Sequence, residues 1–173
     1  ESAGGEFQRQ EDAFRGRVTD DGTHPVARGR YHLYVSLACP WACRTGIVRK
    51  LKPLDESIGM TVVDPIRDEQ GWAFRDGPGH SSDPVNGFRF LREAYVASGP
   101  KFNGRVTVPV LWDTVSKRIV SNSDDDLMRI FNHEFNQFTT DVIDLYPHSL
   151  RQEIDGLNEF IYENVNDGVY RAG

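Results

Sequence analysis

Residues 30–41 read RYHLYVSLACPW, and this stretch decides the fold that the sequence predicts. Residues 30–37 alternate in polarity and are rich in aromatic and β-branched side chains, which predicts a strand. Pro40 is favoured at the first position of a helix, because its missing N–H would have no partner there, and residues 41–51 continue with helix-compatible spacing. Cys39 is therefore expected at the point where a strand becomes a helix.

The segments that follow extend this start to an α/β domain. Residues 59–65 predict a buried strand, which completes a β-α-β unit, and a helix is expected near residues 88–97. Residues 106–112 and 117–121 predict a hairpin. Pro109 cannot donate a ladder hydrogen bond, so it is expected at an edge, a bulge or a cis turn.

The C-terminal part of the sequence predicts helices. One helix is expected to begin at residues 122–126, where good N-cap residues precede three acids that favour the positive end of the helix dipole, and another spans 149–164. The predicted organisation is an irregular arm at 1–29 and an α/β domain at 30–135. A linker and the first helix of an incomplete all-helical domain follow at 136–173.

The composition is that of a globular protein. The chain has 173 residues, of which 38% are hydrophobic and 27% charged, and a net charge of −6. This excludes a disordered or collagen-like chain and argues against nucleic acid as the main partner. No apolar run approaches the ~18 residues of a membrane helix, and no signal peptide is recognisable, so neither membrane insertion nor secretion is expected.

The negative charge is concentrated near the C-terminus. Residues 123–173 hold three arginines and eleven acidic residues, a net charge of −8, which leaves +2 for residues 1–122. Solvated helix faces explain this asymmetry better than an acidic binding surface does.

Cys39 carries the chemistry that the sequence predicts. Unpaired backbone N–H groups and the positive end of the helix dipole stabilise a thiolate, which is the nucleophilic form of cysteine. Pro40 fixes the backbone and removes one competing donor, and Trp41 could supply an aromatic wall. The alternative is an inert buried thiol, because free cysteines are often buried.

Cys43 lies one helical turn after Cys39 and could resolve a mixed disulfide. Two cysteines within one intact helical turn have poor disulfide geometry, so a structural role is favoured for Cys43. A chain with only two cysteines suits reducing, cytoplasmic surroundings. The five histidines lack the spacing of a zinc site, and dinucleotide-binding, P-loop and serine-hydrolase motifs are absent from the sequence. The histidines are His24, His32, His80, His133 and His148.

Five stretches of the sequence, in this order, resemble the Xi-class glutathione transferases, the glutathionyl-hydroquinone reductases. They are Tyr31–Ala42, Gly71–Phe74, Thr107–Asp113, Ile119–Asn122 and Asn166–Gly173. The resemblance implies a thioredoxin-like N-terminal domain, an all-helical C-terminal domain of the glutathione-transferase type, a homodimer and a cis bond before Pro109. It implies no tightly bound cofactor, only a low-molecular-weight thiol as cosubstrate.

In that family the cysteine attacks the thioether of a glutathionyl-hydroquinone, which frees the hydroquinone and leaves a mixed disulfide that a second thiol resolves. The resemblance makes Cys39 the nucleophile and Tyr170 part of the aromatic substrate pocket. It places Trp72 beside the thiol and pairs the Val108 backbone with the peptide of the bound thiol. Ordinary packing is the alternative for Trp72 and Tyr170. The implied thiol-binding set is Pro40, Trp41, Trp72, Thr107, Val108, Pro109, Ser123 and Asp124.

Two positions depart from the family pattern. Where the family has Glu-Ser to hold the γ-glutamyl group, this chain has Ser123-Asp124 followed by Asp125 and Asp126, and three carboxylates should repel a bound carboxylate. We therefore hypothesise a thiol that offers hydroxyls there, such as mycothiol, because carboxylates accept hydrogen bonds from hydroxyls. Cys43 stands where the family usually has histidine.

Three functions remain open from the sequence. They are a thiol-dependent reductase or transferase of hydroquinone conjugates, a non-catalytic transferase-like module that binds hydrophobic ligands or proteins, and a general thiol-disulfide oxidoreductase. Alkylation of Cys39 at different pH distinguishes the first from the second. A quinone conjugate compared with a simple mixed disulfide distinguishes the first from the third.

Overall fold

Residues 30–41 form a central strand of the sheet and the start of the first helix. In the computed structural model, which describes residues 10–140 and 143–172, β1 spans Tyr31–Val35 and all five of its residues are buried. Helix α1 spans Pro40–Leu51, with Pro40 in its first turn. A strand that is buried on both faces lies inside a covered sheet. The predicted strand and helix are therefore confirmed.

Four strands form one mixed sheet in the order β2-β1-β3-β4. Strand β2 (Ile58–Val62) is parallel to β1, which confirms the β-α-β unit. Strands β3 (Val110–Asp113) and β4 (Arg118–Ser121) form the predicted antiparallel hairpin. The expected start of β3 at residue 106 is wrong. The strand begins directly after Pro109, which has no N–H to donate to a ladder.

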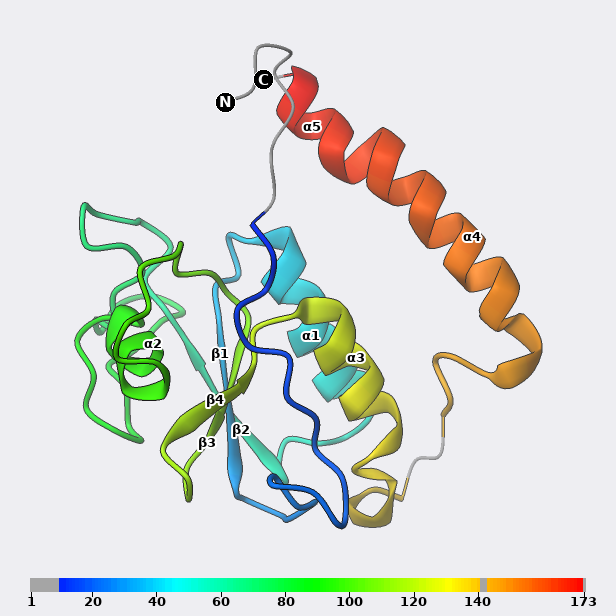
Figure 1. Cartoon of the computed structure of the whole chain (residues 1–173), viewed down its shortest axis with the longest axis horizontal. Helices are drawn as coiled ribbons and strands as arrows, with labels where there is room; N and C mark the ends of the chain where they lie inside the picture. The colour runs from blue at the N-terminus through cyan, green and yellow to red at the C-terminus, as the bar shows by residue number, and fades with distance from the viewer. Residues whose placement is uncertain (1–9, 141–142, 173) are drawn as a thin grey trace. The chain divides into compact units, whose positions relative to one another are not determined.

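Helices cover both faces of this sheet. Figure 1 shows α1 and α3 (Asp124–His133) on one side and α2 (Arg92–Ser98) on the other. Helix α2 is shorter than the predicted 88–97 because residues 89–91 are held alongside the loop at 72–74. Within that pairing the Phe74 N–H donates to the Arg89 carbonyl, and the Leu91 N–H donates to the Trp72 carbonyl, both at 2.9 Å.

The core between the sheet and α3 is aromatic and aliphatic. Tyr31 and Phe135 meet edge to face with their ring centres 5.9 Å apart. The alternation of β1 directs one set of its side chains to this layer. The fully buried apolar residues of β1, β3 and α3 include Leu33, Val35, Leu111, Leu127 and Phe131.

The chain forms two units, one of Asp12–Ile143 and one of Glu1–Glu11 with Asp144–Gly173. The second unit contains α4 (Arg151–Ile161), a π-helical turn (Tyr162–Asn166) and α5 (Asp167–Ala172). Two short 3-10 turns precede α4. One is Asn136–Phe138, in the first unit, and the other is His148–Leu150, in the second unit. The helix predicted at 149–164 is present and continues to Ala172.

Parts of the predicted N-terminal arm and C-terminal segment, namely residues 1–9, 141–142 and Gly173, lie outside the described residues. Among the residues that are described, no helix has the length and apolar character needed to cross a membrane.

His32 is a buried histidine in the centre of the sheet. Its Nε2 lies 2.7 Å from Thr61 Oγ1 on β2. Gly59, its register partner, leaves the space that the ring fills, because a Cβ there would lie 2.4 Å from His32 Nδ1. Burial lowers the pKa of His32 to about 4, against the opposing effect of the Asp83 carboxylate. The ring is therefore neutral in the folded protein near neutral pH.

We expect the free energy of unfolding to decrease as the pH falls from 6.5 to about 4. The unfolded state binds a proton at this histidine near pH 6.5, whereas the folded state does so only near its lowered pKa, so protons stabilise the unfolded state in this range. The contribution of His32 should reach roughly 3 kcal/mol. Urea unfolding of the wild type and His32→Gln at several pH values measures it. The difference between their unfolding free energies should shrink by this amount on acidification, and a constant difference would contradict the prediction.

Candidate functional site

Cys39 is the N-cap residue of α1, with an extended backbone (φ −101°, ψ 112°). Its N–H donates to the Ser36 carbonyl (3.2 Å) and closes the turn after β1. Its carbonyl accepts from the Cys43 N–H (2.9 Å), the first helical hydrogen bond of α1. The Cys39 side chain makes no capping hydrogen bond, and the residue is partly exposed. The predicted position is confirmed, because the thiol lies at the leading end of a helix and is not sealed in the core.

The sheet brings three segments to the edge at which α1 begins. Because β3 runs antiparallel to β1, the peptide Val108–Pro109 lies beside the end of β1. This peptide is cis, as the family resemblance implies. Because β4 runs antiparallel to β3, the start of α3 at Ser123–Asp124 follows at the same edge. Cys39, Val108–Pro109 and Ser123–Asp124 therefore lie at one edge of the sheet although they are far apart in the sequence.

Both tryptophans of the predicted site belong to segments near this edge. The loop that carries Trp72 is tied to the end of β2, because the Asp64 N–H donates to the Ala73 carbonyl (2.9 Å). Trp72 is only 9% exposed, with the Arg67 guanidinium 5.1 Å from its ring. Trp41 is half-buried and stacks under Arg44, at 5.2 Å. Burial of this degree means that Trp72 contributes packing in addition to any contact with a thiol.

Thr107 is held in place by the side chains of Tyr95 and Asn122, which the sequence does not mark as site residues. The Tyr95 hydroxyl donates to the Thr107 carbonyl (2.9 Å) and accepts from its N–H (3.3 Å). Asn122 Nδ2 donates to Thr107 Oγ1 (3.1 Å). Thr107 therefore anchors the segment before Pro109 rather than pointing a free hydroxyl at a ligand.

The start of α3 holds three carboxylates, and each is paired with an arginine. Arg44 Nε donates to Asp124 (2.6 Å), and its Nη2 donates to Asp125 (3.0 Å). Arg15 binds both oxygens of Asp126, at 2.7 and 2.8 Å. Asp124 is only 1% exposed, whereas the Asp125 side chain is 67% exposed. Two arginine charges therefore offset most of the charge of the three carboxylates and leave one negative charge in excess, and the repulsion of a bound carboxylate stays a prediction.

Ser123 is the N-cap of α3 and is itself buried. Its hydroxyl accepts from the Asp126 N–H at 3.4 Å. Arg44 could have been suspected from the sequence, because three neighbouring acids require cations. Nothing in the sequence marks Tyr95, since a tyrosine in an amphipathic helix is usually core.

Tyr170 and Cys43 both lie on helices, in different units of the chain. Tyr170 lies on α5, in the second unit, and its role in a substrate pocket stays a prediction. Cys43 is a free, partly exposed cysteine in α1. Across residues 10–140 and 143–172, no group of three or more His, Cys, Asp or Glu side chains is placed to hold a metal ion.

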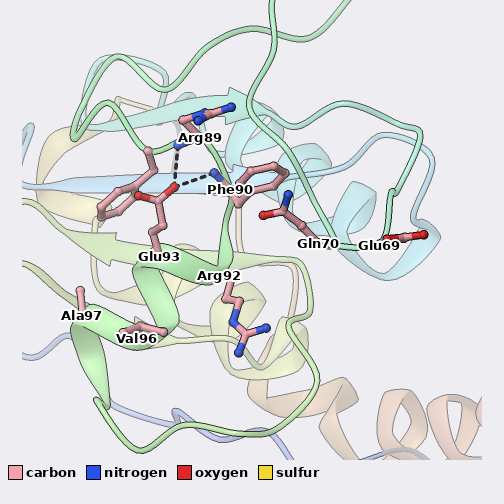
Figure 2. A pocket seen from close by; sticks show the side chains of 9 residues that line it. Glu69, Gln70, Arg89, Phe90, Arg92, Glu93, Val96 and Ala97 are labelled. Carbon is pink, nitrogen blue, oxygen red and sulfur yellow. Dashed lines mark hydrogen bonds between the residues drawn. The ribbon is translucent and has the colours of Figure 1, made fainter.

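A cavity of about 850 Å³ opens elsewhere, between the loop at residues 69–70 and α2 (Figure 2). The Glu93 carboxylate lies in it and accepts the N–H groups of Arg89 (2.8 Å) and Phe90 (2.9 Å). The rest of the lining comes from Glu69, Gln70, Phe88, Arg92, Val96 and Ala97. The cavity holds no nucleophile and none of the predicted thiol-binding residues, so it is separate from the thiol site.

A cysteine at the N-terminus of α1 and a cis peptide before Pro109, at the same end of a β2-β1-β3-β4 sheet, are features that the resemblance to glutathione transferases implies. Glutathionyl-hydroquinone reductase YqjG of Escherichia coli (strain K12) is 48% identical in an alignment 181 residues long. The alignment covers 99% of this chain and 55% of that protein. The chain is thus similar to Xi-class glutathione transferases and glutathionyl-hydroquinone reductases over almost its whole length, as the sequence predicts. No family model matches the chain.

Solved structures agree with this assignment. The Xi glutathione-S-transferase of Phanerochaete chrysosporium has a TM-score of 0.91 at 45% identity, covering 95% of this chain and 57% of that one. The glutathione-bound structure of Escherichia coli YqjG has a TM-score of 0.88 at 46% identity, covering 93% of this chain and 55% of that one. The chain therefore spans just over half the length of the relatives that it matches.

Proposed function

We propose that this chain is the thiol-binding part of a thiol-dependent reductase or transferase of the glutathione transferase superfamily, acting on glutathione conjugates of hydroquinones. The observation that carries the proposal is the partly exposed Cys39 at the N-terminus of α1. In this proposal Asp12–Ile143 is a thioredoxin-like domain, and the helices after Asp144 begin an all-helical domain of a homodimeric enzyme.

The proposed reaction has two steps at Cys39. The thiolate first attacks the glutathione sulfur of the conjugate. A Cys39–glutathione disulfide forms, the bond between sulfur and ring carbon breaks, and the ring carbon takes the electron pair and a proton from solvent. A second glutathione thiolate then attacks the glutathione sulfur of this mixed disulfide, which releases glutathione disulfide and restores the Cys39 thiolate. In the net reaction, the conjugate is reduced to the hydroquinone, and its glutathionyl sulfur and the thiol of one glutathione leave as one glutathione disulfide.

The other edge residues bind and shape the site. The Val108 backbone pairs with the peptide of glutathione, as Pro109 directs this segment toward the end of β1. Pro40 and Trp41 form the helix side of the site, and Trp72 the loop side. Ser123 and Asp124 act by holding the start of α3 in place. Tyr170 contributes to the aromatic substrate pocket.

Glutathione is the proposed cosubstrate rather than mycothiol. The electrostatic reason to exclude a carboxylate is weaker because Arg44 and Arg15 place two positive charges beside the three acids. Asp125, which is exposed, can attract the ammonium group of a γ-glutamyl moiety. Two close structural neighbours of this chain are glutathione complexes, those of Escherichia coli YqjG and Saccharomyces cerevisiae ECM4.

We expect glutathione to resolve the Cys39 adduct at least about tenfold faster than mycothiol does. Preparing the adduct with a radiolabelled conjugate and following release of the label after addition of each thiol measures the two rates. Equal or faster release by mycothiol would restore the hypothesis of a sugar-based thiol.

The function itself is tested by supplying two substrates. A glutathionyl-hydroquinone should be converted to hydroquinone with one glutathione disulfide formed for each turnover, and faster than a small mixed disulfide is reduced. If only the mixed disulfide reacts, the protein is a general thiol-disulfide oxidoreductase. If neither substrate reacts and Cys39 resists alkylation across the pH range, the protein is a binding module.

A further inference from the structure

The N-terminal arm extends the sheet beside β4. The Gly16 N–H donates to the Val120 carbonyl (2.8 Å), and Arg15 forms an isolated antiparallel bridge with Ser121. A Cβ on Gly16 would lie 2.7 Å from the Val120 carbonyl oxygen, so this approach requires glycine. Sequence analysis predicted only an irregular arm here, because the pairing is made across more than 100 positions.

Asn122 joins this arm to the segment that precedes Pro109. The Phe14 N–H donates to Asn122 Oδ1 (2.8 Å), and the Asn122 N–H donates to the Phe14 carbonyl (3.0 Å). On its other side Asn122 Nδ2 donates to Thr107 Oγ1 (3.1 Å). The residue is 4% exposed, so both ends of its amide group are bonded in a site that excludes most water.

Tyr95, on α2, also links Phe14 of the arm to Thr107. Its hydroxyl contacts the N–H, the carbonyl and the Oγ1 of Thr107. The Phe14 ring packs edge-on against the Tyr95 ring, at 5.6 Å, and also contacts Phe102, at 6.1 Å. Burial raises the pKa of Tyr95 to about 12, so its hydroxyl keeps its proton near neutral pH. Phe14 and Thr107 are thus held by one connected set of side chains.

We infer that Asn122 is a positioning residue through which the docked arm fixes Thr107 and thereby the Val108 backbone that receives the thiol peptide. The inference rests on the proposed function, because it assigns the arm a role in thiol binding. Thr107 directly precedes Val108, so a shift of Thr107 moves the peptide group with which glutathione pairs. Shifts of about 1 Å are enough to impair a positioned reaction.

Thr107 offers a matched pair of substitutions. Thr107→Val removes the hydroxyl that Asn122 and Tyr95 contact and keeps the side-chain shape, whereas Thr107→Ser keeps the hydroxyl. We expect Thr107→Val to raise the Kd for glutathione about tenfold and Thr107→Ser to change it less than about twofold. The rate at which iodoacetamide alkylates Cys39 should be the same in all three proteins, because Cys39 is held by a different segment.

A substitution in the N-terminal arm, away from Thr107, gives a second test. Gly16→Ala disturbs docking and substitutes none of the residues proposed to contact glutathione, and Gly156→Ala in α4, where a Cβ meets nothing within 4 Å outside the neighbouring backbone of its own helix, is its control. Gly16→Ala should also raise the Kd for glutathione about tenfold, and Gly156→Ala should not. The double variant Thr107→Val with Gly16→Ala should bind no more weakly than the weaker single variant, because both break one connection.

Hydrogen exchange of the Val108 amide tests the inference without any ligand. Exchange should be faster in Thr107→Val and Gly16→Ala and unchanged in Thr107→Ser and Gly156→Ala. Equal exchange in all variants, additive losses of affinity, or a Thr107→Ser defect as large as that of Thr107→Val would overturn the inference. If the wild type does not bind glutathione, the proposed function fails, and with it the role in thiol binding. Exchange then still decides whether the arm fixes Val108.

Discussion

Replacing Cys39 with serine is expected to lower the rate of hydroquinone release from a glutathionyl-hydroquinone by at least about 10³-fold. A serine hydroxyl is not ionised near neutral pH, and its oxygen cannot form the mixed disulfide that the proposed reaction requires. Release of hydroquinone is followed by chromatography, and the glutathione adduct on the protein is followed by mass spectrometry.

Cys43→Ser is the matched control for this substitution. Cys43 lies one turn further along α1 and is also partly exposed, so both variants lose one accessible thiol from the same helix. Cys43→Ser should keep the rate within about threefold and should still acquire one glutathionyl group at Cys39. A Cys39→Ser protein that retains a tenth of the rate, or an adduct found on Cys43, would show that Cys39 is not the nucleophile.

Replacing Asp113 with asparagine is expected to lower the free energy of unfolding by about 3–5 kcal/mol. The Asp113 side chain is fully buried at the end of β3 and accepts two hydrogen bonds from Arg30, at 2.9 and 2.6 Å. His24 Nδ1 lies 2.9 Å from the same carboxylate, and the Val115 N–H donates to it at 2.9 Å. Burial acts to raise the pKa of Asp113, but the bonds from Arg30 and His24 outweigh it and hold the pKa well below its usual range. Asparagine would leave the Arg30 charge without its partner.

Urea unfolding measured by circular dichroism gives this loss directly. Asp20→Asn, at an exposed position of the arm, makes the same chemical change and should alter the unfolding free energy by less than about 0.5 kcal/mol. Asp113 is at the opposite end of β3 from Pro109, so alkylation of Cys39 in the folded Asp113→Asn protein should proceed at the wild-type rate. A stability loss below about 1 kcal/mol would mean that the Arg30 pair is not a main support of the fold.

Short-range signals made most of the fold predictable. The strand before Cys39, the helix after Pro40 and the hairpin before α3 each depend on residue types within a few positions, and all three are present. Boundaries were less reliable. Helix α2 starts later than predicted because residues 89–91 pair with a loop that lies about twenty positions earlier, and local spacing contains no information about that pairing.

The candidate site also has features that are local in the sequence and features that depend on distant residues. The position of Cys39 was predictable because a strand-to-helix junction is a local property, and its role as nucleophile stays a prediction. The charge at the start of α3 is not given by the sequence, which shows the three acids together but not Arg44 and Arg15, which reach them from other segments. Asn122 and Tyr95 were not assigned to the site because their partner Thr107 lies 15 and 12 positions away, beyond the range of a local pattern.

The sequence by itself determined the main helices and strands, their order, the resemblance to a family and the cysteine at the leading end of a helix. These depend on backbone preferences and on patterns that neighbouring residues set. Only the tertiary structure decided which arginine neutralises which carboxylate, where the arm docks and what fixes Thr107. The contacts of Arg44 and Arg15 with the carboxylates join residues 80 and 111 positions apart, and the contact of Asn122 with Thr107 joins residues 15 positions apart. Their geometry exists only once the sheet register has brought the elements together.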